Sequence, residues 1–393
     1  MKRIVCILLT LLLIISFVAC DDEGEAEQTD NTTAATTTDA GEPNKNPPTN
    51  DVTINKGDNA QMVTNTYNLT HYTKGVKVLG VRALKSDAQI NCDWTGSGIE
   101  MKIDHKGGDI VFRAKSTAGC LFKAYVDEVI QKNPTMYTTV TNQMTEIVIK
   151  NVAAGVHMIR LINVTGHMLA RASIYSVTFA GTIIDDGVKD NDLYIEFVGD
   201  SISCGWGVIG PNDGTFAAQD GELAYPLMTA KALGADYSIL GLSGQGLMCY
   251  TQQIDEGYLL SSMLRDRTVQ YGFERKADVV VINVGTNDYG YRNQAQLGIT
   301  ESAFRSEYKS FIETVKSKNG ADCKIVCVYN VMNDTFQNEI MGAVSELGGE
   351  ESGIYTLRLD RSTNNKAGGH PSAEDNEKYT KVLTEFIENI IKD

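Results

Sequence analysis

The hydrophobic and polar positions of this chain follow two patterns, one before and one after about residue 185. From about residue 60 to 182, short runs in which apolar and polar residues alternate are separated by turn residues. Alternation with a period of two is typical of β-strands that bury one face, and no long amphipathic helix pattern interrupts it. The pattern predicts an antiparallel β-sandwich of the jelly-roll type over residues 59–184.

Two hairpins are predicted within this first half. One has its turn at residues 105–109, which contain Gly107 and Gly108, and the other has its turn at Ala154 and Gly155. Each turn lies between two alternating apolar runs. Glycine between such runs is a typical hairpin signal, because glycine adopts the backbone angles of tight turns without steric cost.

After about residue 190, continuous apolar runs replace the alternation. Such runs are typical of strands that are covered on both faces. They occupy residues 194–199, 237–242, 278–285, 324–331 and 354–359. Helix-like patterns separate them, near residues 223–234, 303–318 and 336–347. The alternation of strands and helices predicts a parallel, doubly wound α/β sheet over residues 185–393.

A final helix is predicted near the C-terminus. Ser372 and Asp375 have the spacing of a capping box, in which the two residues satisfy each other's backbone N–H groups at a helix start. The apolar positions that follow repeat every 3.6 residues, as expected for an amphipathic helix. They are Tyr379, Val382, Leu383, Phe386, Ile387, Ile390 and Ile391.

The first residues have the pattern of an export signal. Lys2 and Arg3 precede an almost unbroken apolar run at residues 4–18, and Ala19 and Cys20 follow it. This arrangement resembles a bacterial lipobox, in which the cysteine becomes the lipidated first residue. We interpret residues 1–20 as a lipoprotein signal peptide, with a plain signal peptide or a short membrane anchor as alternatives. The expected location is the bacterial envelope, on the outer membrane or cell surface or in the periplasm.

A polar segment follows Cys20. From residue 21 to about residue 51 there is no aromatic residue and no Leu, Ile, Val or Met, while Thr, Asp, Glu, Asn and Pro predominate. A segment with no apolar side chains to bury cannot offset the entropy lost on ordering. A disordered, acidic and Thr-rich linker is therefore predicted over residues 21–58.

Charge and cysteine spacing exclude several classes of function. The net charge of −15 argues against a nucleic-acid partner. The six cysteines after Cys20 form no CxxC pair and have no nearby histidine, so no metal site is expected. Cys323 and Cys327 lie in an apolar run, which predicts buried thiols rather than a disulfide. No other segment approaches the ~20 apolar residues of a membrane span, so contact with a membrane is expected only through Cys20.

Chemistry-bearing residues follow the predicted parallel strands, where ligands gather in such sheets. Ser201, Gly244 and Asn287 follow three successive strands, and His370 precedes the last helix. A serine hydroxyl needs an adjacent base to act as a nucleophile, and His370 is the single histidine of this half. The backbone N–H groups of Ser201 and Gly244 and the amide of Asn287 could stabilise an oxyanion. Asp200 and Asp288 are expected to bond loops and cap helices instead.

Four segments resemble the conserved blocks of the SGNH hydrolases, in the same order: GDSISCGWG, SGQG, VVINVGTND and GGHPS. Over about residues 75–390 the chain is most similar to carbohydrate esterase family 2, whose members place a β-sandwich before the hydrolase domain. The resemblance implies a five-stranded, flavodoxin-like sheet. It also implies Ser201 as nucleophile, His370 as base, and Gly244 and Asn287 in the oxyanion hole.

One position departs from the family pattern. Most SGNH enzymes have Asp three residues before the histidine, where this chain has Ala367. The imidazole still needs an acceptor that selects its tautomer. We interpret the site as a Ser-His dyad, as in some members of family 2, with Asp360 as an alternative third acid. Trp206, five residues after Ser201, is either a platform for a sugar ring or a packing residue of a helix that follows the nucleophile.

The expected function is that of a serine esterase that removes acetyl groups from a plant polysaccharide such as xylan or glucomannan, or from oligosaccharides derived from it. No cofactor and no metal are expected, and the protein should act as a monomer. One alternative is another SGNH activity, such as an esterase, lipase or thioesterase. The other is a surface lipoprotein that binds glycan without catalysis.

Overall fold

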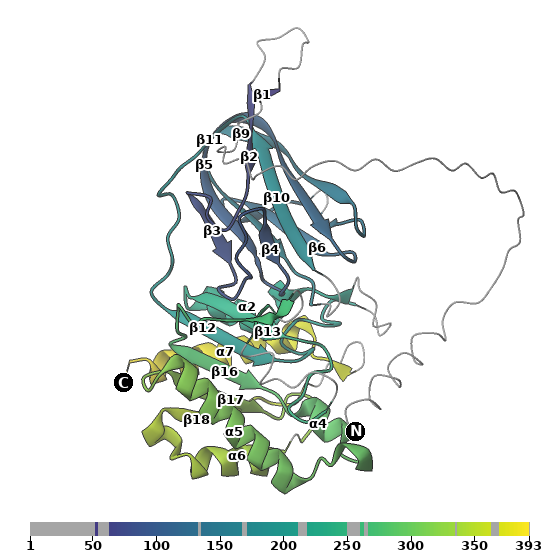
Figure 1. Cartoon of the computed structure of the whole chain (residues 1–393), viewed down its shortest axis with the longest axis vertical. Coiled ribbons are helices and arrows are strands. Elements are labelled where there is room, and N and C mark those ends of the chain that lie inside the picture. Colours follow the sequence, from purple (N-terminus) through teal and green to yellow (C-terminus); the bar gives the residue numbers. More distant parts are fainter. Residues whose placement is uncertain are drawn as a thin grey trace, which may run out of the picture. The chain divides into compact units, whose positions relative to one another are not determined.

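The computed structural model contains two large β-sheets, an 11-stranded antiparallel sheet from the first half of the chain and a five-stranded parallel sheet from the second (Figure 1). Residues 50–393 form one compact unit. The structure describes residues 52–53, 63–132, 135–166, 171–210, 218–249, 260–262, 266–334, 336–362 and 369–392. Cys20 and the predicted signal peptide and linker up to residue 51 lie outside this range.

The antiparallel sheet is built on two long strands, β5 (Gly98–Ser116) and β9 (Met144–Asn163), which pair along their whole length. Alternate residues of both strands are buried, and their apolar side chains make up a core of their own. The main path of the sheet is β1 (Val52–Thr53), β2 (Thr64–Asn68), β10 (Ala172–Phe179), β5, β9, β6 (Leu121–Val126) and β7 (Val129–Ile130). The strands off this path are β3 (Val76–Leu79), β4 (Ile90–Cys92), β8 (Tyr137–Thr138) and β11 (Gly181–Ile183).

Both predicted hairpins are wrong, because the glycine segments expected to turn lie inside β5 and β9. His105 pairs with Gly155, and the register shifts between Gly108 and Ile110. Gly107 and Gly108 have φ values of +101° and +102°, the left-handed backbone that many turns also need. Here the strand continues through this irregular stretch. A glycine pair in the sequence indicates unusual backbone angles. Pairing with the neighbouring strand β9 determines whether β5 continues through them or reverses.

The parallel sheet confirms the predicted α/β architecture. Its strand order is β13 (Asp236–Gly241), β12 (Tyr194–Gly199), β16 (Val279–Asn283), β17 (Lys324–Tyr329) and β18 (Ile354–Arg358). All four pairings are parallel. In chain order this is 2-1-3-4-5, the flavodoxin-like arrangement, whose switch point lies between β12 and β16. Ligand sites of such folds lie at the carboxyl ends of these two strands.

Helices cover both faces of this sheet (Figure 1). On one face, α5 (Glu301–Asn319) and α6 (Gln337–Glu346) pack with Val280 and Ile282. On the other, α2 (Tyr225–Ala232) and α7 (Ala373–Ile390) pack with Phe197 and Val281. The predicted capping box of Ser372 and Asp375 is present at the start of α7.

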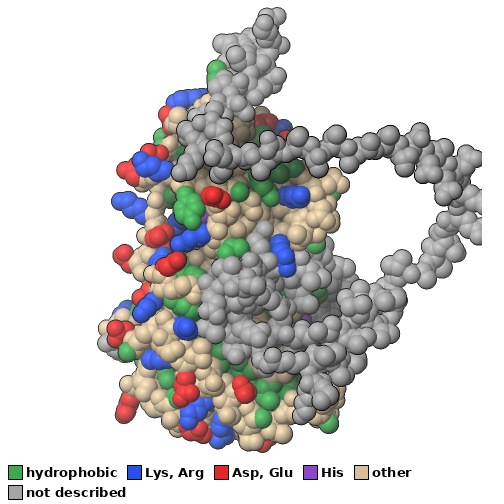
Figure 2. Space-filling model, in the orientation of Figure 1, with side chains coloured by type: hydrophobic (Ala, Val, Ile, Leu, Met, Phe, Trp, Pro, Cys, Tyr) green, Lys and Arg blue, Asp and Glu red, His purple; other side chains and the backbone are tan. Residues whose placement is uncertain are grey.

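The remaining elements are short. They are η3 (Gly221–Leu223), β14 (Leu260–Ser262), β15 (Asp266–Gln270), α4 (Thr286–Tyr291), η4 (Ala295–Leu297) and η5 (Gly349–Ser352). None of the helices in the described part of the chain is long and apolar enough to cross a bilayer. On the face in Figure 2, acidic and basic side chains are interspersed over the visible described surface.

Candidate active site

The candidate nucleophile lies in a tight turn directly after β12. The Asp200 carboxylate accepts the N–H of Ile202 at 2.9 Å, and the N–H of Trp206 donates to the Ser201 carbonyl at 3.0 Å. The N–H of Cys204 donates to the Asp200 carbonyl at 3.2 Å. Ser201 itself is 7% exposed. These bonds fix the serine at the carboxyl end of the first parallel strand.

His370 reaches this serine from the other end of the domain. Its Nε2 atom lies 2.6 Å from Ser201 Oγ, a distance at which the hydroxyl can donate to an unprotonated ring nitrogen. Pro371 and Ser372 connect the histidine to α7, and the capping box of Ser372 fixes the start of that helix. The structure thus brings together the two residues that the sequence pointed to as nucleophile and base.

Asn287 and Gly244 lie on the loops that surround the serine. The Asn287 Nδ2 atom donates to Asp200 Oδ2 at 3.0 Å and to the Gln245 carbonyl at 2.9 Å. It therefore links the loops that follow β12, β13 and β16. Gly244 has φ +80°, and a Cβ atom there would meet nothing within 4 Å, so its loop is open on that side. Their role as oxyanion donors stays a prediction.

Asp288 holds the loop that carries Gly244. Its carboxylate accepts the N–H groups of Leu247, Met248 and Cys249 at 3.0, 2.7 and 3.0 Å. Gly246 permits this close approach, because a Cβ atom there would lie 2.5 Å from Asp288 Oδ2. Asp288 thus bonds a loop, as the sequence suggested, but it does not cap a helix, because Gly285 is the N-cap residue of α4.

Asp200 is fully buried between these loops. Burial raises the pKa of its carboxyl to about 7; the N–H bond from Ile202 opposes this rise, and the charge of Asp288 adds to it. Desolvation disfavours a carboxylate unless enough donors face it, and two donors, from Ile202 and Asn287, reach this one. The same carboxyl therefore links the nucleophile turn to the candidate oxyanion donor and titrates near neutral pH.

The structure places the other predicted residues less centrally. Trp206 is half-buried in the nucleophile turn. Asp360 follows β18, is exposed, and forms no hydrogen bond or ion pair with His370 in the described part of the chain. Ala367 lies outside the described residues. The six cysteines after Cys20 are buried free thiols, as predicted for Cys323 and Cys327.

A buried network near the serine was not foreseen from the sequence. The Tyr225 hydroxyl contacts the side chains of Ser203 and Asn283, and the Tyr225 backbone N–H donates to the side chain of Asn376 on α7. A tyrosine in an apolar helix pattern gives no sign of this role. The sequence offered one signal, which is the polar residue Asn376 in the first turn of the amphipathic helix that follows Ser372.

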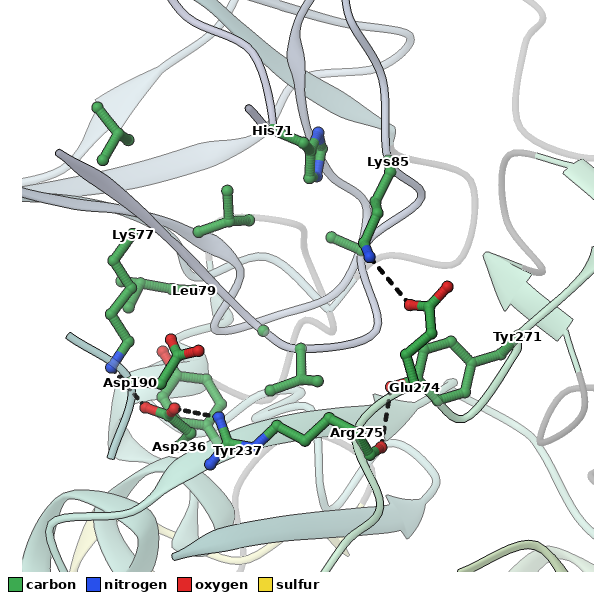
Figure 3. Close-up of a pocket in the computed structure, with 15 residues that line it drawn as sticks. His71, Lys77, Leu79, Lys85, Asp190, Asp236, Tyr237, Tyr271, Glu274 and Arg275 are labelled. Atoms are coloured by element: carbon green, nitrogen blue, oxygen red, sulfur yellow. Dashed lines mark hydrogen bonds and ion pairs between the residues drawn. The ribbon is translucent and has the colours of Figure 1, made fainter. Parts of the chain in front are cut away.

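A separate pocket of about 340 Å³ lies at the opposite edge of the parallel sheet (Figure 3). Asp236 begins β13, whereas Ser201 follows the end of the adjacent parallel strand β12. Lys77 of β3 pairs with Asp236 at 2.6 Å, and Lys85 pairs with Glu274 at 2.9 Å (Figure 3). The pair of Lys77 and Asp236 joins the antiparallel sheet to the parallel one.

The residues that the structure describes include no cluster of three or more His, Cys, Asp or Glu arranged to hold a metal ion. The described site therefore presents a hydroxyl, an imidazole, an amide and backbone N–H groups. Together these groups can perform nucleophilic acyl transfer.

Comparison with known proteins extends this result. Residues 197–380 match the GDSL-like lipase/acylhydrolase family. The cellulase/esterase CelE of Acetivibrio thermocellus is 25% identical over 76% of this chain, and this chain spans 37% of the length of that protein. An acetylxylan esterase / glucomannan deacetylase of Cellvibrio japonicus is 26% identical over 61% of this chain and 71% of its own length.

A solved structure shares the whole architecture. It is a family two carbohydrate esterase from Clostridium thermocellum in complex with cellohexaose, with a TM-score of 0.72 and 24% identity over 81% of this chain and 99% of that one. The likeness confirms the predicted fold, an α/β domain preceded by a β-sandwich. The matched region 197–380 begins in β12 and ends in α7, so it contains Ser201, Asn287 and His370. The region that matches the GDSL-like lipase/acylhydrolase family therefore contains the candidate nucleophile, the candidate base and the candidate oxyanion amide.

Proposed function

We propose that this chain is a carbohydrate O-acetyl esterase that removes acetyl groups from xylan, glucomannan or oligosaccharides derived from them. The main observation behind this proposal is the 2.6 Å contact between His370 Nε2 and Ser201 Oγ at the carboxyl edge of the sheet. The substrate class is supported by the relative from Cellvibrio japonicus, named an acetylxylan esterase / glucomannan deacetylase. The shared fold with a family two carbohydrate esterase agrees with it.

The mechanism that we propose has two steps. As Ser201 Oγ attacks the acetyl carbonyl carbon, His370 Nε2 accepts the hydroxyl proton, and the carbonyl oxygen becomes an oxyanion. The oxyanion accepts hydrogen bonds from the N–H groups of Ser201 and Gly244. It also accepts one from the Asn287 amide, which releases its bond to the Gln245 carbonyl to make it. The bond to the sugar oxygen then breaks, and that oxygen takes the proton from His370. This leaves an acetyl group on Ser201.

Water completes the cycle. His370 accepts a proton from a water molecule while the water oxygen attacks the acetyl carbonyl carbon. The bond to the Ser201 oxygen then breaks, and this oxygen takes the proton from His370. The products are acetate and the free serine. No other protein group has to supply or remove a proton. Trp206, half-buried beside the nucleophile turn, is proposed as an aromatic surface for a sugar ring.

Acetate release from acetylated xylan and acetylated glucomannan tests the proposal. The intact protein should release acetate, and Ser201→Ala should abolish the release. Hydrolysis of p-nitrophenyl esters should fall as the acyl chain lengthens from acetyl to octanoyl. A preference for long chains would point to a lipase, and no release from any acetylated glycan would overturn the proposal.

We also propose that the protein is exported and anchored to the bacterial envelope by a lipid on Cys20, and that it acts as a monomer. The support is the apolar run at residues 4–18 and its end at Cys20. Metabolic labelling with palmitate should mark the protein but not Cys20→Ala. Light scattering on the secreted Cys20→Ala form should give the mass of one chain. Labelling of Cys20→Ala, or a dimer mass, would contradict these proposals.

A further inference from the structure

Tyr225 lies beneath the candidate active site and makes hydrogen bonds in two directions. It is the first residue of α2, and its side chain is fully buried. Its hydroxyl lies 2.9 Å from Ser203 Oγ and accepts the side-chain N–H of Asn283 at 3.2 Å. Ser203 belongs to the nucleophile turn and Asn283 is the last residue of β16, so this hydroxyl joins the two strand ends that flank the switch point.

The backbone of the same residue bonds the helix that follows the histidine. The Tyr225 N–H donates to Asn376 Oδ1 at 2.9 Å, and Asn376 Nδ2 donates to the Ser372 carbonyl at 2.8 Å. The N-cap residue of α2, Ala224, has no side chain that could accept this N–H. Asn376 of α7 therefore supplies the missing cap from another helix. The helices α2 and α7 lie on the same face of the sheet (Figure 1).

Short and conformationally restricted backbone segments connect these hydrogen bonds to Ser201 and His370. Ser203 is two residues after Ser201, in a turn with three backbone bonds of its own. Ser372 is two residues after His370, and Pro371 between them has a fixed φ. The Tyr225 ring is held edge-to-face against Phe197, with ring centroids 6.3 Å apart.

We propose that Tyr225 is a positioning residue, which holds the Ser201 turn and the His370 segment at hydrogen-bonding distance from each other. The proposal rests on the proposed function, because the reaction needs this distance. Burial raises the pKa of Tyr225 far above neutral pH. The hydroxyl therefore stays uncharged, and it acts through geometry alone. A displacement of about 1 Å between reacting groups can cost a hundredfold in rate.

The test is Tyr225→Phe, which keeps the ring and the backbone N–H and removes only the hydroxyl. We expect kcat on p-nitrophenyl acetate to fall about tenfold to a hundredfold, with KM within about twofold of the wild-type value. Phosphonylation of Ser201 by a p-nitrophenyl phosphonate, followed by mass spectrometry, should slow by a similar factor. The control is Tyr237→Phe, which removes another buried hydroxyl, bonded to the Gly96 carbonyl at 2.7 Å, and should retain wild-type kcat.

Ser203→Ala removes the other partner of the contact between Tyr225 and Ser203, and it should also lower kcat. The double variant should lose less than the sum of the two single losses, because both changes remove this same contact. If Tyr225→Phe does not fold, Ser203→Ala alone decides. A folded variant with kcat and phosphonylation within twofold of the wild type would overturn the proposal. Phosphonylation needs no sugar. A wild-type protein that reacts with the phosphonate but deacetylates no glycan would therefore overturn the proposed function and leave this test valid.

Discussion

The guanidinium of Arg82 and the carboxylate of Glu196 form a buried ion pair, in which Nε lies 2.6 Å from Oε2 and Nη2 donates a hydrogen bond to Oε1 at 3.0 Å. Their side chains are 0% and 1% exposed. Arg82 lies between β3 and β4 of the first half of the chain, whereas Glu196 lies in the middle of β12. The rings of Tyr271 and Phe273 flank the guanidinium at 4.4 and 4.6 Å. A residue from the first half thus completes the core of the parallel sheet.

Arg82→Met should lower the free energy of unfolding by about 3–5 kcal/mol, because it leaves the Glu196 carboxylate buried and unpaired. Urea unfolding measures this loss. The double variant Arg82→Met/Glu196→Met should recover most of the stability, since two apolar side chains replace the pair. Lys85→Met, which breaks the exposed pair with Glu274, is the control and should leave the midpoint unchanged. An equal effect of Arg82→Met and Lys85→Met would show that the buried pair is not needed.

Asn287→Ala should lower kcat a hundredfold to a thousandfold, about 3–4 kcal/mol of transition-state stabilisation, with a much smaller effect on KM. The amide would no longer face the oxyanion, while ground-state binding of the ester would persist. Initial rates on p-nitrophenyl acetate give both constants. Asn191→Ala removes a similar amide bonded to Asp236 at the far edge of the sheet, and it should leave kcat unchanged. A rise in KM with kcat unchanged would indicate that the amide contributes to substrate binding instead.

Asp200→Asn should change how stability depends on pH. Burial raises the pKa of Asp200 to about 7, whereas an unfolded chain releases this proton near pH 3.9. Between these values the unfolded state binds fewer protons than the native state, so the Asp200 contribution to stability falls as pH rises and levels off above 7. The wild-type free energy of unfolding minus that of Asp200→Asn should decline between pH 4 and 7, by up to about 1.4 kcal/mol per pH unit.

Chemical denaturation of both proteins across this pH range measures the difference. Subtraction removes the contributions of the other titrating carboxyls, which the two proteins share. A difference that stays constant from pH 4 to 8 would mean that Asp200 is ionised throughout in the native protein.

Gly246→Ala should reduce both activity and stability. The added Cβ would lie 2.5 Å from Asp288 Oδ2 and from Cys249 Sγ, so the loop must move away from the carboxylate that holds it. Overpacking of this kind typically costs about 1–3 kcal/mol. The control is Gly290→Ala on α4, where a Cβ meets nothing within 4 Å. Thermal unfolding and kcat should both remain near wild type in the control, and a Gly246→Ala protein with full activity would contradict the role of this loop.

Several parts of the site could be predicted because they depend on local sequence. Ser201, Gly244 and Asn287 each follow an apolar run, and the carboxyl ends of parallel strands meet at one edge of a sheet. The capping box of Ser372 and Asp375 needs only the spacing of two residues on one helix.

Other parts depended on which segments pair in space. Gly107 and Gly155 predicted turns, yet each lies in a long strand whose partner keeps it extended. Tyr225 looked like an ordinary core residue, and its role depends on Ser203 and Asn376, which lie 22 and 151 residues away in the chain.

The sequence by itself determined the class of each half, the order of the strands and helices in the second half, and the pair Ser201 and His370, because periodicity and strand-end chemistry are local properties. Only the tertiary structure decided that β5 and β9 run without a turn. The structure also decided that Arg82 neutralises Glu196, and that Asp200 and Tyr225 join the loops around the serine. These features arise from contacts between distant segments, and burial sets their energies.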